Sequence, residues 1–262
     1  MNSSLIASRN TPAKATELHA KASPDFAAKL TETEALLQRA ASDFQPVTQA
    51  SSLGAEDVVI THIINRLRLD IPVFVLETGA LHTETLALLE RTQAHSRAPV
   101  NVYRPEQQSV VWFIRNEGQN AMYKSIQLRK ACCNIRKMEP LSRALAGKKA
   151  WITGLRQEQS AARAEVPLHD ESEVAAAPGS SAGASPSAGL HKFNPLARWT
   201  WGDVWHYIAT QGVDYNPLHD QFFPSIGCAP CTRAISLGEE FRAGRWWWED
   251  EAAKECGLHV KG

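Results

Sequence analysis

The chain alternates between short apolar runs and longer stretches with helical periodicity. The short runs, bounded by turn residues, predict β-strands, and the stretches in which apolar residues recur every three or four positions predict α-helices. The expected strands are 47–51, 73–76, 100–103 and 150–153, and the expected helices are 24–41, 56–68, 84–93, 110–116 and 135–146. Strands separated by helices are typical of βαβ units. We therefore expect an α/β fold with a parallel sheet that binds ligands at the carboxyl ends of its strands.

Other segments depart from this alternation. Residues 1–22 are polar and rich in Ala and Lys, which predicts a disordered N-terminal tail. Residues 171–189 are mostly Ser, Ala, Gly and Pro, which predicts a flexible loop within the domain. A capping box at Thr200 predicts a helix over 204–210 that ends at Gly212. The expected limits are 23–238 for a single domain and 239–262 for a mobile C-terminal tail.

The overall charge excludes partners that bind through a strong general field. Lys plus Arg and Asp plus Glu both number 28, so the net charge is zero. Nothing in this balance predicts binding to nucleic acid or to a membrane surface, and any anion site must be local. The N-terminus has no long apolar run of a signal peptide or membrane helix. We therefore expect a cytoplasmic protein whose thiols stay reduced.

Two loops at predicted strand ends carry residues suited to binding an anion. Hydroxyls, a glycine and backbone N–H groups at a helix N-terminus can cradle a phosphate, although small residues at such a turn are also structurally ordinary. The loops face the same crevice if both strands belong to one parallel sheet. The first contributes Ser51, Ser52, Gly54, Glu56 and Asp57, without the Gly-Lys-Ser/Thr of a Walker A loop, and the second contributes Glu77, Thr78 and Gly79.

Four of the five cysteines form two tight pairs, Cys132 with Cys133 and Cys228 with Cys231. Four thiolates can bind zinc or an iron–sulfur cluster. Adjacent cysteines converge poorly on one small ion, whereas a cubane offers a separate iron to each sulfur. The pattern therefore favours a [4Fe–4S] cluster over zinc and over four structural thiols.

Basic residues and the fifth cysteine complete the candidate chemistry. Lys137 follows the first cysteine pair, Arg156 and Arg163 lie in a loop after a predicted strand, and Arg242 and Arg245 lie near the C-terminus. Each could be a solvated surface charge, but together they could bind one anionic group, with arginine giving bidentate contacts. Cys256 lies in a polar tail where Lys254 and His259 could lower the pKa of its thiol, although a bystander thiol has the same local sequence.

Several segments, in order, resemble the assimilatory adenylyl-sulfate (APS) reductases of the PAPS/APS reductase family. They are SSLGAED, LETG, the Cys-Cys…Cys-x-x-Cys set, NPLARWTWGDVW, RAGRWWWE and KECGLH, and the resemblance runs from about residue 44 to residue 259. It implies a Rossmann-like, adenine-nucleotide-binding fold shared with the ATP pyrophosphatases. It further implies reduction of adenosine 5′-phosphosulfate to sulfite and AMP, with thioredoxin or a similar protein as reductant.

The resemblance also implies a role for each matching residue. Cys256 would attack the sulfate sulfur and form an S-sulfonate, with His259 close to it. Lys137 would link the cluster to the substrate sulfate, and Arg242, Arg245 and the Arg156–Arg163 loop would bind phosphate and sulfate oxygens. The four paired cysteines would ligate the [4Fe–4S] cluster. Two departures from the family pattern are LETG, where LDTG is usual, and GLRQEQSAAR, which lacks the commoner paired arginines.

Other functions remain open on the sequence. A reductase of the 3′-phosphorylated nucleotide (PAPS), or of both nucleotides, would share the tail cysteine, but that branch generally lacks the four paired cysteines. An ATP-pyrophosphatase-type enzyme would need Ser-Gly-Gly-x-Asp-Ser in place of SSLGAED. An iron–sulfur or zinc regulator would leave KECGLH unused. The sequence does not decide whether the protein forms a homo-oligomer.

Overall fold

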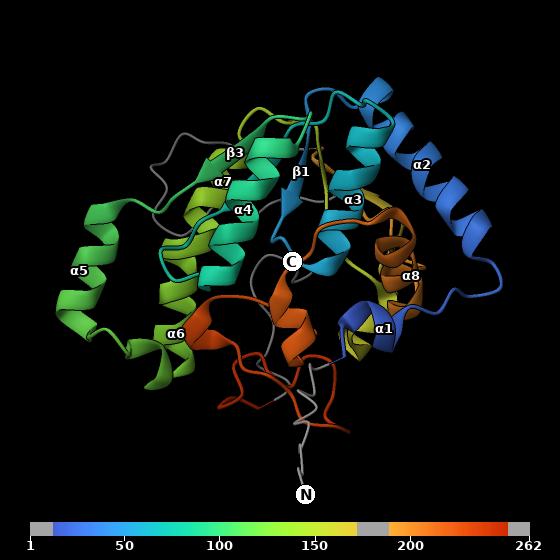
Figure 1. The fold of residues 1–262 in the computed structure, drawn as a ribbon. Helices are drawn as coiled ribbons and strands as arrows, with labels where there is room; N and C mark the ends of the chain where they lie inside the picture. The colour runs from blue at the N-terminus through green and yellow to red at the C-terminus, as the bar shows by residue number, and fades with distance from the viewer. Residues whose placement is uncertain (1–12, 172–188, 251–262) are drawn as a thin grey trace, which may run out of the picture.

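The computed structural model describes residues 13–171 and 189–250, and these form the expected α/β domain (Figure 1). The described strands make one sheet in the order β3-β2-β1-β4-β6-β5, parallel throughout except that β5 runs antiparallel to β6. The strands are β1 (Val47–Ser51), β2 (Val73–Leu76), β3 (Val100–Tyr103), β4 (Ala150–Ile152), β5 (His169–Glu171) and β6 (His191–Phe193). The helices are α1 (Ala15–His19), α2 (Phe26–Asp43), α3 (Ala55–Arg66), α4 (Thr83–His95), α5 (Gln107–Glu117), α6 (Ile126–Cys133), α7 (Glu139–Leu145) and α8 (Trp201–Gln211).

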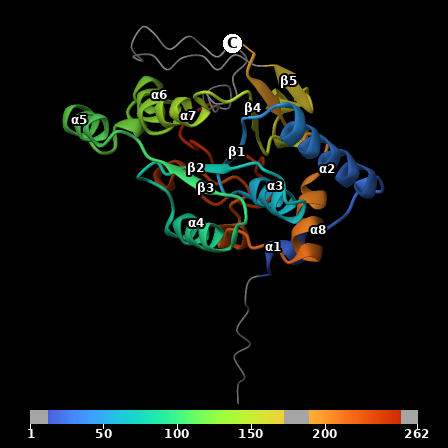
Figure 2. The same cartoon turned by 90° about the horizontal axis from the view of Figure 1, so that it is seen from above.

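Both faces of the sheet are covered, which explains why β2 and β4 are apolar at consecutive positions. Alternate side chains of a strand point to opposite faces. Val73, Val75 and Ile152 belong to the larger core, which includes α3 and α8, whereas Phe74 and Trp151 pack with α7 on the other face. Figure 2 shows α3 and α4 on one side of the sheet and α6 and α7 on the other.

The helix expected over 135–146 begins earlier than predicted. α6 starts at Ile126, where the Ser125 hydroxyl accepts a hydrogen bond from Leu128 N at 3.2 Å. It continues through a π-helical turn, Asn134–Met138, into α7. This N-cap was not predicted from the sequence, so Cys132 and Cys133 were expected outside a helix, whereas they lie in the last turn of α6. The capping box at Thr200 and the left-handed Gly212 at the end of α8 are confirmed.

The prediction of a loose tail over residues 1–22 is wrong for its described part. Ala15 in α1 is buried, and its backbone N–H donates to Asp220 Oδ1 at 2.7 Å. Lys21 N donates to Gly202 O at 3.2 Å, an approach that the missing side chain of Gly202 permits. A five-residue helix has little stability of its own, so contact with the domain holds it. This contact is long-range and leaves no local mark in the sequence.

Two further elements were not expected. The polar strands β5 and β6 pair at one edge of the sheet. In sequence, β5 and β6 lie on either side of the Ser/Ala/Gly-rich segment, most of which is outside the described residues. The segment therefore joins two neighbouring strands of one sheet. Residues 239–250, which the sequence predicts as part of a mobile tail, pack on the domain: Trp246 is buried and its backbone N–H donates to Cys231 O at 3.1 Å. Among the described residues, no helix is both long and apolar enough to cross a membrane.

Candidate functional site

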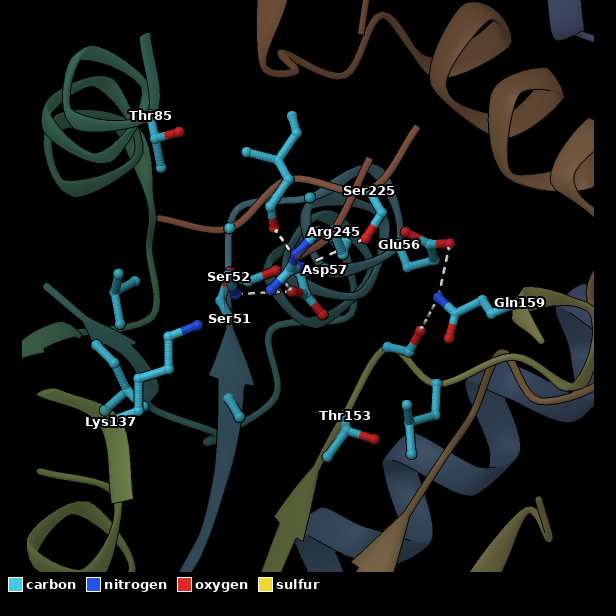
Figure 3. A pocket seen from close by; sticks show the side chains of 18 of the residues that line it. Ser51, Ser52, Glu56, Asp57, Thr85, Lys137, Thr153, Gln159, Ser225 and Arg245 are labelled. Carbon is cyan, nitrogen blue, oxygen red and sulfur yellow. Dashed lines mark hydrogen bonds between the residues drawn. The ribbon is translucent and has the colours of Figure 1, made fainter. Parts of the chain in front are cut away.

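The main cavity, about 210 Å³, opens at the carboxyl ends of β1, β2 and β4, where ligands bind in parallel sheets (Figure 3). One part of its wall is apolar and includes Phe74, Leu141 and Trp151. The structure brings most of the predicted anion-binding residues to this one cavity, although they come from distant segments. They are Ser51, Ser52, Gly54, Glu56, Asp57, Thr78, Lys137, Arg163, Arg242 and Arg245.

The loop between β1 and α3 is held in shape by Asp57. The backbone N–H and the hydroxyl of Ser52 both donate to Asp57 Oδ2 at 2.7 Å. Burial raises the pKa of the Asp57 carboxyl to about 6, against the opposing effect of these hydrogen bonds. A Cβ at Gly154 would lie 2.4 Å from Asp57 Oδ1, so the backbone after β4 must pass close to the loop. The loop is therefore rigid, and α3 begins directly behind it at Ala55.

The basic part of the cavity wall is built largely from the C-terminal segment. Arg245 Nη1 donates to Ile226 O at 3.3 Å and lies 3.4 Å from Ser225 Oγ. Its guanidinium rests against Gly227, where a Cβ would lie 2.5 Å from Nη2. Lys137, from the π-helical turn after α6, approaches the same cavity (Figure 3). Cationic groups from distant segments thus surround a space beside the β1–α3 loop, an arrangement that suits a polyanionic group.

A second cavity of about 230 Å³, the cysteine cavity, is lined by the four cysteines that lie close together in sequence, Cys132, Cys133, Cys228 and Cys231. Lys137 and Arg245 line it as well as the main cavity, so the two cavities share walls. The Cys228–Cys231 turn is fixed by Ala229 N, which donates to Ala80 O at 2.7 Å. Thr78 Oγ1 lies 3.2 Å from Cys228 Sγ.

Two of the four thiols, Cys132 and Cys231, have surroundings that disfavour the thiolate. Burial raises the pKa of the Cys231 thiol to about 12 and raises the pKa of Cys132 as well. Within the described ranges, no three His, Cys, Asp or Glu side chains are arranged to hold a metal ion. The four cysteines surround a cavity with basic neighbours, which is a donor set that fits an anionic, thiolate-bound group.

Three predicted binding residues lie outside the main cavity wall. Glu77 Oε1 accepts from Gly79 N at 2.7 Å, and Glu77 Oε2 accepts from Arg104 Nε at 3.2 Å. Gly79, with φ +69°, lines the cysteine cavity, and a Cβ there would lie 3.1 Å from Arg136 Nη1. Arg156 is fully buried behind the main cavity and pairs with Glu56 at 2.9 Å. Cys256 and His259 lie outside the described residues.

His219 lines the main cavity and was missed by the sequence analysis. The side chain is buried, and neither ring nitrogen makes a hydrogen bond of normal geometry among the described residues. Burial lowers the pKa of the imidazole to about 4, although Glu56 and the Phe223 backbone act in the opposite direction. No local motif marks this histidine. Its place depends on the packing of α8, whose Trp205 ring lies 5.2 Å from the imidazole.

Several known proteins are similar to this chain over most of its length. An adenosine 5′-phosphosulfate reductase of Allochromatium vinosum is 48% identical over 224 residues, covering 86% of this chain and 82% of the relative. Proteins of the same name from Burkholderia cepacia and Neisseria meningitidis are 47% and 45% identical, covering 90% and 88% of this chain and 90% and 91% of the relatives.

Solved structures share the fold. The phosphoadenylyl-sulfate (PAPS) reductase of Candida auris matches with a TM-score of 0.61 at 24% identity, covering 80% of this chain and 97% of that one. The FMN adenylyltransferase of Candida glabrata matches with a TM-score of 0.53 at 11% identity, covering 92% and 82%. At these identities the likeness concerns the fold alone. Residues 46–234 match the family described as the phosphoadenosine phosphosulfate reductase domain, and with the 45–48% identical relatives this places the chain in that family.

Proposed function

We propose that this protein reduces adenosine 5′-phosphosulfate to sulfite and AMP. The observation that carries the proposal is that Lys137 and Arg245 line both the main cavity and the cysteine cavity. A nucleotide with its base against the apolar wall would direct its phosphosulfate towards these two cations. The adenosine 5′-phosphosulfate reductases among the relatives support the choice of substrate.

The residues of the main cavity would bind and orient this substrate. Lys137, Arg242 and Arg245 would offset the charge on the phosphate and sulfate oxygens, with the arginines able to make bidentate contacts. Backbone N–H groups of the β1–α3 loop, at the N-terminus of α3, would meet the same anion. Fixed cations beside the leaving phosphate would also stabilise the negative charge that develops there.

The covalent chemistry is assigned to Cys256, which lies outside the described residues. Its thiolate would attack the sulfate sulfur, the bond from sulfur to the phosphate oxygen would break, and AMP would leave with that electron pair. The product is a Cys256 S-sulfonate. A thiolate of thioredoxin or a similar dithiol protein would then attack the Cys256 sulfur and expel sulfite, and its second thiol would resolve the mixed disulfide. The dithiol thus supplies both electrons. His259 would favour the Cys256 thiolate.

The paired cysteines Cys132, Cys133, Cys228 and Cys231 would hold a [4Fe–4S] cluster in the cysteine cavity. When bound, the cluster would order these segments and set the charge beside the substrate, while carrying no electrons in net turnover. Lys137 would lie between the cysteines and the substrate, since it lines both cavities. Thiolate ligands and a dithiol reductant both suit a reducing compartment, so we place the activity in the cytoplasm.

The decisive experiment is mass spectrometry of the protein mixed with adenosine 5′-phosphosulfate without a reductant. We expect a sulfonate on Cys256 together with one AMP released per chain. Cys256→Ser should form no adduct while it still binds AMP. An adduct on another cysteine, or AMP release without an adduct, would overturn the mechanism.

Two companion measurements address the cluster and the choice of nucleotide. Protein prepared without oxygen should contain about four iron and four sulfide per chain, and zinc in their place would contradict the cluster. The kcat/KM for adenosine 5′-phosphosulfate should exceed that for its 3′-phosphorylated form. The reverse order would identify a PAPS reductase, and equal values a dual enzyme.

A further inference from the structure

Arg156 is a buried guanidinium at the junction of four segments of the chain. Its Nε donates to Glu56 Oε1 at 2.9 Å, and its Nη1 donates to Glu158 Oε2 at 2.7 Å and to Trp199 O at 3.3 Å. The guanidinium carbon lies 5.3 Å from the ring centroid of Trp201 and 5.6 Å from that of Phe241. Arg156 does not line the main cavity. The sequence suggested it as an anion ligand, but its guanidinium instead binds groups of the protein itself.

Its partner Glu56 has an unfavourable position for an anion-binding site. Glu56 lines the main cavity in the first turn of α3, and its side chain is only 10% exposed. A bare carboxylate there would repel a phosphosulfate, and the repulsion would be strong because little water screens it. Arg156 Nε and Gln159 Nε2 both donate to Glu56 Oε1, at 2.9 Å and 3.0 Å (Figure 3 shows the second contact). Two donors thus hold Glu56 Oε1, and the positive charge of Arg156, which it shares with Glu158, offsets the Glu56 carboxylate at the cavity wall.

The same guanidinium touches the segment that supplies the cavity's arginines. The Phe241 ring packs edge-on against Trp201, with centroids 4.9 Å apart and the planes at 84°. Arg242, which lines the main cavity, directly follows Phe241. One buried side chain thus contacts both the start of α3 and the segment that carries Arg242.

We propose that Arg156 is a positioning residue that makes the main cavity able to accept an anion by neutralising Glu56. This inference rests on the proposed function for its substrate. Loss of the positive charge at position 156 would leave the Glu56 side chain at the cavity wall without its arginine partner. The affinity for the nucleotide would fall, and removing the Glu56 charge as well would restore most of it. A purely structural role for Arg156 predicts no such relief.

The test compares four proteins: wild type, Arg156→Met, Glu56→Gln and the double variant. The measurements are AMP affinity by calorimetry, KM and kcat for adenosine 5′-phosphosulfate, and thermal midpoint. We expect Arg156→Met to weaken AMP binding and raise KM by about tenfold or more. The double variant should recover most of that loss while its thermal midpoint stays as low as that of Arg156→Met. Arg198→Lys, in an exposed ion pair with Glu32, is the matched control.

Several outcomes would overturn the proposal. One is a lower thermal midpoint with unchanged AMP affinity and KM in Arg156→Met, and another is a double variant that binds AMP no better than Arg156→Met. If Arg156→Met does not fold, the same comparison applies to Arg156→Gln, which keeps hydrogen-bond donors but has no charge. Failure of the proposed function is distinguishable, because wild type would then neither bind AMP nor turn over adenosine 5′-phosphosulfate.

Discussion

Arg129 and Glu249 form a buried bidentate ion pair that ties the C-terminal segment to α6. Arg129 Nε donates to Glu249 Oε1 at 2.9 Å and Nη2 donates to Oε2 at 2.7 Å, with the two side chains 1% and 3% exposed. The Arg129 guanidinium also lies 4.7 Å from the ring centroid of Trp246. The pair therefore fixes the end of the described chain beside the cysteine cavity, which Arg129 lines.

Removal of one partner of this pair should destabilise the fold strongly. In Glu249→Ala the Arg129 charge stays buried without its counter-ion, which typically costs about 3–5 kcal/mol of unfolding free energy. Urea denaturation measures the loss. Glu32→Ala, which breaks the exposed pair with Arg198, should cost less than about 1 kcal/mol. Similar losses in the two variants would contradict the role given to burial.

Gly227 should be required to keep the Arg245 guanidinium in its observed position. A Cβ at Gly227 would lie 2.5 Å from Arg245 Nη2 and 2.6 Å from Cζ, so alanine must displace the guanidinium. A displacement of about 1 Å can cost up to about a hundredfold in rate, and we expect kcat/KM for adenosine 5′-phosphosulfate to fall by at least about tenfold. In an Arg245→Lys background, Gly227→Ala should add little, because the two changes act on one group. Additive losses would refute this coupling.

Gly154 should resist substitution more than Gly54, although both glycines line the main cavity. A Cβ at Gly154 would lie 2.4 Å from Asp57 Oδ1 and 2.9 Å from Glu56 Cβ, whereas at Gly54 the nearest atom would be Ser52 Oγ at 3.4 Å. We expect Gly154→Ala to lower the unfolding free energy by about 1–3 kcal/mol and Gly54→Ala by less than about 1 kcal/mol. Thermal and urea unfolding of the two variants side by side measure these losses. A smaller loss in Gly154→Ala than in Gly54→Ala would show that the backbone after β4 can move away from Asp57.

His219 should make the protein less stable in mild acid. Burial holds the pKa of His219 at about 4, below the ordinary value of 6.5, so the unfolded chain takes up a proton first as the pH falls. The contribution of neutral His219 to the unfolding free energy is present above about pH 6.5 and declines from there towards pH 4, by about 2.5 kcal/mol at pH 4.5. His219→Phe should lack this part of the decline. Unfolding free energies at pH 7 and pH 4.5, compared between variant and wild type, measure it, and equal declines would contradict the assignment.

The local pattern of the sequence determined the central fold. The strands β1 to β3 begin and end at the predicted residues, because short runs rich in β-branched and aromatic residues between turn residues are a local signal. The Thr200 capping box and Gly212 predicted α8 for the same reason. The sequence also contained the pairing of the cysteines and the polar loops at the strand ends. Parallel strands bring such loops to one edge, so their meeting in the main cavity could be predicted.

Contacts between distant segments decided the rest. α1, β5 and β6 have weak intrinsic preferences and form only because α8 and β4 offer them a partner. His219 lies in the main cavity through the packing of α8, and residues 239–250 are fixed by the Arg129–Glu249 pair. Arg156 illustrates the reason. The sequence can indicate that an arginine suits an anion, but only the folded chain determines that Arg156 pairs with Glu56, a hundred positions away.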